Sequence, residues 1–210
     1  MSIVHIPDWK KDVFSDKTLG RVLRASIGVV GSPYDAALAA AAMVFGMTIG
    51  TLSTFSWEFT ASAGVIAAIL QDWSIVAAGF AAAILGFLIA GFSIFATMTE
   101  KSLFHDLAQI KSNGRSISDF KFVFYNFLYV FIHYLFYMAM SLFVCFMFVP
   151  ASPIWFAWSL VSDIDPYLAR FCTLCFAIFF GSYSLYAVLL LRSFIWSMYQ
   201  SLLIAIFADA

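Results

Sequence analysis

The chain has 210 residues, of which 63% are apolar and only 11% carry a charge. Soluble globular domains have about 45 to 50% apolar and about 25% charged residues, so this composition excludes an ordinary soluble domain and puts the apolar excess against lipid. A net charge of −1 hides a strong clustering of the Lys and Arg residues along the chain. The three cysteines, Cys145, Cys172 and Cys175, fall inside apolar runs and give no disulfide framework.

Residues 1–35 are the predicted cytoplasmic or interfacial segment. They begin with charged residues and a proline, where a cleavable signal has a basic stub and an apolar core, so we expect no cleavage. Within residues 16–30 four apolar side chains share one helical stripe and three basic ones lie largely off it. The stripe contains Leu19, Val22, Leu23 and Ile27, and the bases are Lys17, Arg21 and Arg24. This pattern predicts a basic amphipathic helix on the inner leaflet or one packed on a partner.

Four segments are long and apolar enough to cross a bilayer. A helix rises about 1.5 Å per residue, so about 20 apolar residues cross a hydrocarbon core of about 30 Å. The sequence therefore predicts an all-α, polytopic membrane domain over 36–191. Its spans are 36–57, 73–98, 122–149 and 171–191. The apolar stretch 59–70 is too short to span unaided and predicts a re-entrant or interfacial loop.

The basic residues predict the orientation of these spans. Cytoplasmic segments of membrane proteins carry an excess of Lys and Arg. Of the eleven bases, all but Arg170 lie before the first span, in the loop 99–121 or directly after the fourth span. The N- and C-termini are therefore predicted to be cytoplasmic, which requires an even number of crossings.

Small residues recur at every fourth position in the first two predicted spans. Their positions are Ala42, Gly46 and Gly50 in the first, and Ala78, Ala82, Gly86 and Ala90 in the second. Small side chains at this spacing let helix backbones approach closely in lipid. The ladders indicate helix contacts, either within one subunit or between copies. Because four helices give each subunit little interior, we expect a homo-oligomer.

The third predicted span contains a polar stripe on one helical face. The stripe contains Asn126, Tyr129, His133 and Tyr137. Polar groups face lipid tails at high cost, so this face is predicted to point into the bundle or toward an oligomer axis. His133 then either lines a pore or relays protons, or is neutral and hydrogen-bonded to a neighbour, which is the commoner case. Candidate partners on the fourth span are Ser182, Tyr183, Ser184 and Tyr186.

The residue pattern does not predict an enzyme. His133 and Ser182 are expected at similar depth, but Ser182 lacks the following glycine of intramembrane serine proteases and no oxyanion donors can be named. The pair Cys172 and Cys175 lies in an apolar helix with nothing to activate a thiol. The three histidines fall in separate segments, so no metal site is predicted. We expect no catalysis and no cofactor.

The cytoplasmic loop 99–121 is the predicted docking surface for a soluble partner. Thr99 begins an expected helix whose Leu103, Leu107 and Ile110 form one apolar edge, and a turn follows it. The docking residues are Lys101, Leu103, Phe104, Leu107, Ile110, Lys111 and Arg115. The alternative is that this helix folds back on its own bundle. The tail 192–210 is expected to extend the fourth helix into the cytoplasm or to lie flat on lipid.

The four-span architecture and the loop segment 95–104, FATMTEKSLF, resemble the KwaA-like membrane subunit of the Kiwa anti-phage defence system. The resemblance implies a non-enzymatic, oligomeric sensor in the bacterial inner membrane that recruits a cytoplasmic DNA-binding defence subunit. The leading hypothesis is thus a membrane scaffold or sensor with a cytoplasmic protein partner and no direct contact with nucleic acid. The alternative is a small oligomeric channel or transporter lined by the polar face of the third span.

Overall fold

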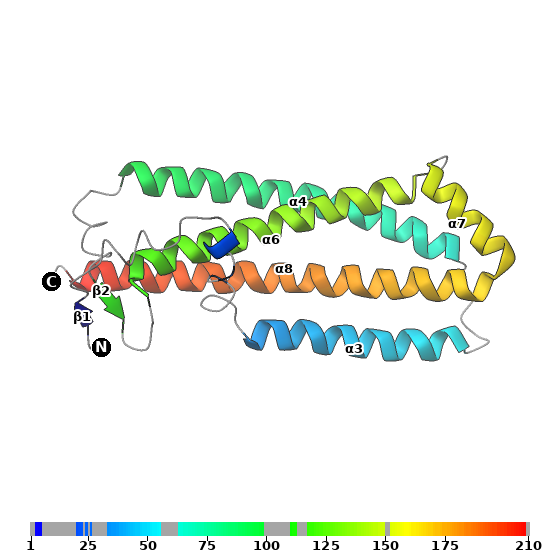
Figure 1. The fold of residues 1–210 in the computed structure, drawn as a ribbon, viewed down its shortest axis with the longest axis horizontal. Helices are drawn as coiled ribbons and strands as arrows, with labels where there is room; N and C mark the ends of the chain where they lie inside the picture. The colour runs from blue at the N-terminus through cyan, green and yellow to red at the C-terminus, as the bar shows by residue number, and fades with distance from the viewer. Residues whose placement is uncertain are drawn as a thin grey trace. The chain divides into compact units, whose positions relative to one another are not determined.

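The computed structural model describes residues 3–5, 20–22, 24, 26, 33–55, 63–98, 110–112, 117–149 and 152–208, and these are almost entirely helical (Figure 1). The long helices are α3 (Pro33–Phe55), α4 (Ala63–Met98), α6 (Asp119–Met147) and α8 (Pro166–Ala208). The shorter helix α7 (Pro153–Ile164) lies between α6 and α8 in the chain. The predicted all-α class is confirmed.

Three of these helices are long and apolar enough to cross a membrane. The qualifying stretches are Ala63–Ile94, Phe120–Met147 and Pro166–Gln200. Helix α3 contains the shorter apolar stretch Tyr34–Ile49 within its 23 residues. The described chain therefore has the architecture of a helical membrane protein. Helices suit this medium because they satisfy every backbone hydrogen bond within one segment.

Three of the helices begin with a polar side chain that caps the first turn. Ser118 Oγ accepts a hydrogen bond from the Lys121 amide at the start of α6, and Ser152 Oγ accepts one from the Trp155 amide at the start of α7. At the start of α8, Asp165 Oδ1 accepts from the Tyr167 amide at 3.1 Å. Each side chain satisfies an amide that has no partner within its helix. Prolines follow two of these caps, at the first helical position, where no amide is needed.

Helix α4 corrects the predicted second span. The helix begins at Ala63, whereas the sequence predicted a loop over 59–70 and a span from residue 73. Residues 63–70 form the first two turns of one continuous helix of 36 residues. Gln71 and Asp72, which marked the expected boundary, lie on a face that is half-buried or exposed. A polar residue on such a face does not end a helix, because the backbone hydrogen bonds continue past it.

Helix α8 decides between the two alternatives for the C-terminal tail. It is continuous over 43 residues and includes the predicted span 171–191 and the tail as far as Ala208. The tail therefore extends the fourth helix. At about 1.5 Å per residue α8 is about 65 Å long, twice the thickness of a hydrocarbon core of about 30 Å. The helix is therefore longer than a single crossing along the bilayer normal requires.

A two-stranded ribbon joins the N-terminus to the loop between α4 and α6. The strand β1 (Ile3–His5) pairs antiparallel with β2 (Ile110–Ser112), and Val4 lies opposite Lys111. Ile110 therefore belongs to a strand, and the prediction that it completes a helical edge is wrong. The pairing partner lies more than 100 residues earlier in the chain, so local helical periodicity could not reveal it. The rest of the predicted loop helix, residues 99–109, lies outside the described residues.

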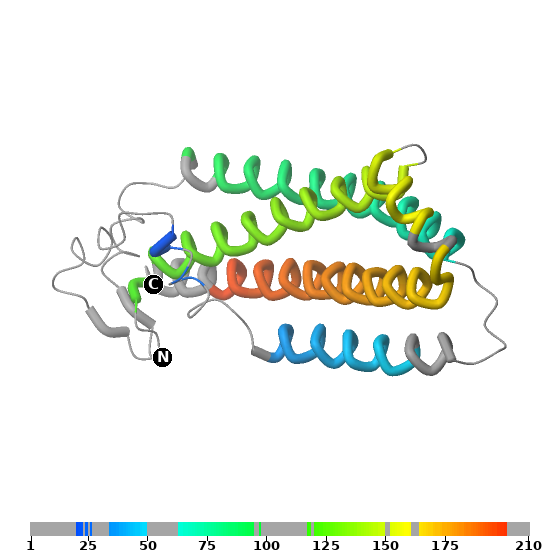
Figure 2. The backbone as a smooth tube through the Cα atoms, turned by 45° about the vertical axis from the view of Figure 1, so that its right-hand side comes forward, coloured from blue at the N-terminus to red at the C-terminus, as the bar shows by residue number. Residues whose placement is uncertain are grey.

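Contacts divide the chain into two compact units. The first contains 1–32, 85–133 and 190–210, and the second contains 33–84 and 134–189. Each unit contains a segment of α4, a segment of α6 and a segment of α8, helices whose courses are drawn in Figures 1 and 2. In the second unit α6 buries side chains at alternating intervals of three and four, as expected for a helix with one buried face. These are Tyr134, Tyr137, Ser141 and Val144, and the interval continues to Phe148 after the helix ends.

Candidate functional site

A polar cluster joins α6 to α8 inside the second unit. The Tyr137 hydroxyl donates a hydrogen bond of 2.7 Å to Ser184 Oγ, and Ser184 Oγ donates one of 2.8 Å to the Phe180 carbonyl. The Tyr134 hydroxyl donates to the Ala187 carbonyl at 2.8 Å. Both tyrosines are buried. Phenolic groups can be buried in an apolar bundle in this way because each hydroxyl has a partner.

The other three stripe residues lie in the first unit. Tyr129 is buried and packs edge-on against the half-buried His133 ring, with centroids 4.5 Å apart. Asn126 is only 3% exposed, and its Nδ2 has no hydrogen-bond partner within the described part of the chain. A buried amide nitrogen without a partner is uncommon in native proteins. The predicted stripe is thus a run of buried or half-buried groups, distributed over the two units.

Two of the four partners that the sequence proposed on the fourth span contact Tyr137 of the stripe, one by a hydrogen bond and one by ring packing. Ser184 bonds Tyr137, whereas Ser182, Tyr183 and Tyr186 line a shallow pocket of about 230 Å³ between α3 and α8 in the second unit. The α3 wall of that pocket contains Ala36, Ala39, Ala40 and Met43. Tyr183 also packs its ring against Tyr137. The sequence named four candidates that lie on different sides of α8, and the residue that makes the bond depends on how α8 is rotated against α6.

The two small-residue ladders have different surroundings. A Cβ atom added at Gly46 would lie 2.8 Å from Ile178 Cγ2, so this glycine allows close packing of α3 on α8. Ala42 is half-buried, and only the backbone of Gly50 is described. On α4, Ala82, Gly86 and Ala90 are exposed, and a Cβ added at Gly86 would meet nothing within 4 Å. The first ladder therefore contributes a contact within the chain, and the second leaves an open face.

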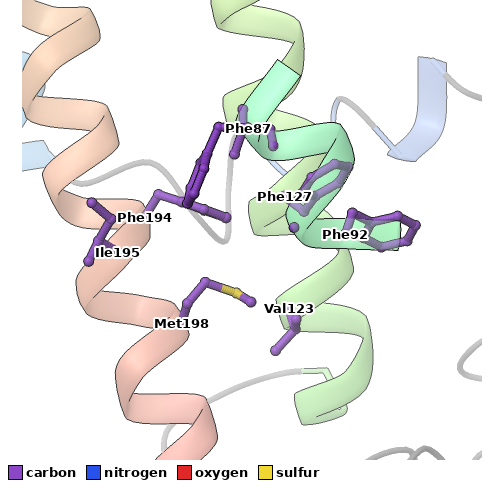
Figure 3. Close-up of a pocket in the computed structure, with 9 residues that line it drawn as sticks. Phe87, Phe92, Val123, Phe127, Phe194, Ile195 and Met198 are labelled. Atoms are coloured by element: carbon purple, nitrogen blue, oxygen red, sulfur yellow. The ribbon is translucent and has the colours of Figure 1, made fainter. Parts of the chain in front are cut away.

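The first unit contains an apolar cavity that the sequence did not predict. It has a volume of about 240 Å³ and is lined by side chains from three helices (Figure 3). These are Phe87, Leu88, Gly91 and Phe92 of α4, Val123 and Phe127 of α6, and Phe194, Ile195 and Met198 of α8. In the sequence these residues are indistinguishable from other apolar helix positions. No linear pattern could have identified the cavity, because it exists only where the three helices meet.

The predicted docking surface is described at two of its residues. Ile110 and Lys111 belong to β2 and pair with His5 and Val4 of β1. The other five docking residues lie outside the described part of the chain. They are Lys101, Leu103, Phe104, Leu107 and Arg115.

Potential reactive groups lie in both units. Cys145, Cys172 and Cys175 are free thiols. Among the described residues, no three His, Cys, Asp or Glu side chains gather as metal ligands would. His133 belongs to the first unit and Ser182 to the second. The geometry thus offers packing and hydrogen bonding, and the non-enzymatic character of the chain stays a prediction.

Comparisons with protein families, curated proteins and solved structures find no match to this chain. The resemblance to the Kiwa membrane subunit therefore stays a prediction that rests on the sequence alone. Any function must be argued from the helices and the contacts between them.

Proposed function

We propose that the chain is a four-span, non-enzymatic scaffold or sensor subunit of a bacterial inner membrane. Helix α3 would be the first span, because its 23 residues rise about 35 Å, enough for a hydrocarbon core of about 30 Å. Four crossings return the C-terminus to the side of the N-terminus. The clustering of ten of the eleven bases supports a cytoplasmic location for both ends.

The observation that carries the scaffold proposal is the hydrogen bond between Tyr137 and Ser184. A pore or proton path needs polar groups that are open to water or ions. The Tyr137 hydroxyl instead bonds a neighbouring helix, and its side chain is buried. This arrangement supports a role for the second-unit part of the polar stripe in holding α6 against α8.

Self-association is the second part of the proposal. The exposed ladder Ala82, Gly86 and Ala90 leaves room for another helix to approach α4 closely. Copies related by symmetry would bury this face on each other. The oligomer would then recruit a soluble protein through the loop 99–121. Following the Kiwa resemblance, we propose that this partner is a DNA-binding defence subunit.

The alternative function is a small channel or transporter. One observation favours it, namely the buried Asn126 amide nitrogen that has no hydrogen-bond partner. Such a group, beside Tyr129 and His133 on the same helix, would suit a hydrated path through the first unit. It is the weaker proposal, because a single orphaned amide does not define a path.

A paired experiment separates the two functions. The intact protein is purified from its native membrane with associated proteins identified, and the same preparation is tested for ion flux in liposomes. The scaffold proposal expects a soluble protein to co-purify in stoichiometric amount, with no flux. Flux that disappears in Asn126→Ala and His133→Ala, while partner binding persists, would replace the scaffold with the channel.

A further inference from the structure

The residues of the described chain that line the cavity between α4, α6 and α8 in the first unit are eight apolar side chains and one glycine. Leu88, Val123 and Phe194 are buried in its wall, whereas Phe87 and Ile195 at its rim are exposed. The cavity is therefore closed by packed side chains on one side and open at the surface of the unit on the other. Figure 3 shows the side chains of the three helices around it.

Two features give the cavity a defined form. Phe92 of α4 and Phe127 of α6 stack with their centroids 4.5 Å apart, so two adjoining helices present one aromatic wall. Gly91 of α4 also lines the cavity, and a Cβ added there would meet nothing within 4 Å. The space exists partly because this position has no side chain.

The lining restricts the chemistry of an occupant. A buried water needs two to four polar partners, and the lining side chains supply none. A polar metabolite would lose its hydrogen bonds to water without replacement. The volume of about 240 Å³ exceeds that of an engineered apolar cavity of about 150 Å³ that stays dry and binds benzene. A slender apolar group is therefore the occupant that fits.

The position of the cavity indicates the source of that group. All three lining helices contain stretches that are long and apolar enough to cross a membrane. On α8, the exposed Trp196 and Tyr199 follow directly after the rim and pack together with ring centroids 5.9 Å apart. Exposed Trp and Tyr on membrane helices mark the boundary between headgroups and acyl chains. In a bilayer these two rings would place the opening where phospholipid acyl chains begin.

We propose that this cavity is a lipid-binding site that holds one acyl chain of a bilayer phospholipid as part of the folded unit. The chain would enter past Phe87 and Ile195 and lie against the Phe92 and Phe127 rings. The proposal requires that α4, α6 and α8 lie in a bilayer, and it does not depend on a scaffold or channel role.

Photochemical labelling tests the proposal directly. The protein is reconstituted in vesicles of phosphatidylethanolamine and phosphatidylglycerol that contain a small fraction of phosphatidylcholine with a diazirine on one acyl chain. After irradiation, the sites of lipid attachment are mapped by mass spectrometry. We expect labelling concentrated on Met198 and its neighbours in the lining of α6 and α8. Labelling should saturate as the photoreactive fraction rises.

Two cavity-filling variants and a matched control sharpen the test. Gly91→Leu fills the space from α4, and Met198→Phe fills it from α8. Gly79→Leu adds the same side chain as the first variant to the same helix, at a glycine outside the cavity where a Cβ also meets nothing within 4 Å. We expect each filling variant to reduce labelling of the cavity lining several-fold and Gly79→Leu to leave it unchanged.

The possible outcomes are distinct. Uniform, unsaturable labelling of all exposed apolar faces, unaffected by Gly91→Leu and Met198→Phe, would mean that only the general lipid annulus contacts the chain and would overturn the proposal. Loss of labelling in both filling variants, with labelling retained in Gly79→Leu, would support the site. Failure of the scaffold proposal in the pull-down would leave the labelling result unchanged, so the two proposals fail separately.

Discussion

Tyr137 and Ser184 join α6 to α8 by a hydrogen bond of 2.7 Å, and the serine is itself anchored to the Phe180 carbonyl. Tyr137→Phe removes the phenolic hydroxyl and leaves the ring in place. Because Ser184 keeps its second bond, we expect a loss of only about 0.5 to 1 kcal/mol in the free energy of unfolding. Reversible unfolding in mixed detergent measures this loss.

A double-mutant cycle with Ser184→Ala isolates the pair. The second substitution should cost little once Tyr137→Phe is present. Fully additive losses in the double variant would show that the bond contributes nothing. Ion flux in liposomes should not differ between the wild type and Tyr137→Phe, and a reduced flux would indicate that the hydroxyl lines a conduction path.

Leucine substitutions at Gly46 and Gly86 are predicted to change the free energy of unfolding by different amounts, although both glycines belong to small-residue ladders. Gly46→Leu should destabilise the folded chain by about 1 to 3 kcal/mol, because even the first carbon of the new side chain would lie 2.8 Å from Ile178 Cγ2. Gly86→Leu adds the same group where nothing lies within 4 Å, so the free energy of unfolding should change little. Thermal unfolding in detergent compares them.

The oligomeric state provides the second measurement for this pair. If copies associate through the open face of α4, Gly86→Leu should lower the apparent mass of the purified complex in light scattering. An unchanged mass would remove that face from the subunit interface.

Ile178→Ala should partly restore the stability of Gly46→Leu, since it removes the atom that the new side chain meets.

Gly181 and Trp73 form a second close contact between helices. A Cβ added at Gly181 would lie 2.9 Å from the far edge of the Trp73 ring, which also packs edge-on against Phe180. We expect Gly181→Ala to destabilise the second unit by about 1 kcal/mol or more, because a rigid indole must be displaced. Near-ultraviolet circular dichroism and thermal unfolding report this change. Equal stability of wild type and Gly181→Ala would mean that α4 and α8 are further apart.

Asp165 is predicted to contribute to stability through the start of α8. Its Oδ1 accepts hydrogen bonds from the Tyr167 and Leu168 amides, both at 3.1 Å. Asp165→Ala removes this cap and should cost about 0.5 to 2 kcal/mol in the free energy of unfolding. Asp165→Asn is the matched control, because an asparagine oxygen caps a helix about as well. If the two variants are equally destabilised, the carboxylate charge matters more than the cap.

The proposed topology predicts opposite accessibilities for two engineered cysteines in a background without the three native thiols. Ser112→Cys lies in β2, on the predicted cytoplasmic side, and Ile164→Cys lies at the exposed end of α7, on the predicted outer side. An impermeant maleimide added to intact cells should label Ile164→Cys alone. Labelling of Ser112→Cys without disruption of the membrane would reverse or invalidate the orientation.

The bounds of two long helices were predicted from the sequence to within a few residues. The ranges predicted as spans 36–57 and 122–149 correspond within a few residues to the helices α3 and α6, because the length of an apolar run is readable from the sequence. The start of α4 was misplaced by ten residues, since Asp72 was read as a boundary. An aspartate determines which part of a helix avoids lipid, but it does not interrupt the backbone hydrogen bonds.

For the candidate site, the sequence predicted which residues of α6 share one helical face, but it did not predict their bonding partners on α8. The repeat along α6 placed Asn126, Tyr129, His133 and Tyr137 on one side, and the structure buries three of them. Choosing Ser184 over its neighbours required the rotation of α8 against α6. Nearly every residue in this segment is apolar. The sequence pattern therefore does not reveal which side of α8 faces α6.

The amino-acid sequence by itself determined the helical class of this protein and the presence of helices long and apolar enough to cross a membrane, because apolar length is a local property. It did not predict the pairing of β1 with β2 or the start of α4. Only the tertiary structure decided that Gly46 packs on Ile178 while Gly86 stays open, and that eight apolar side chains and one glycine line a cavity in the first unit. These outcomes depend on the distance and rotation between helices. Those quantities arise from the shapes of many side chains fitting together at once.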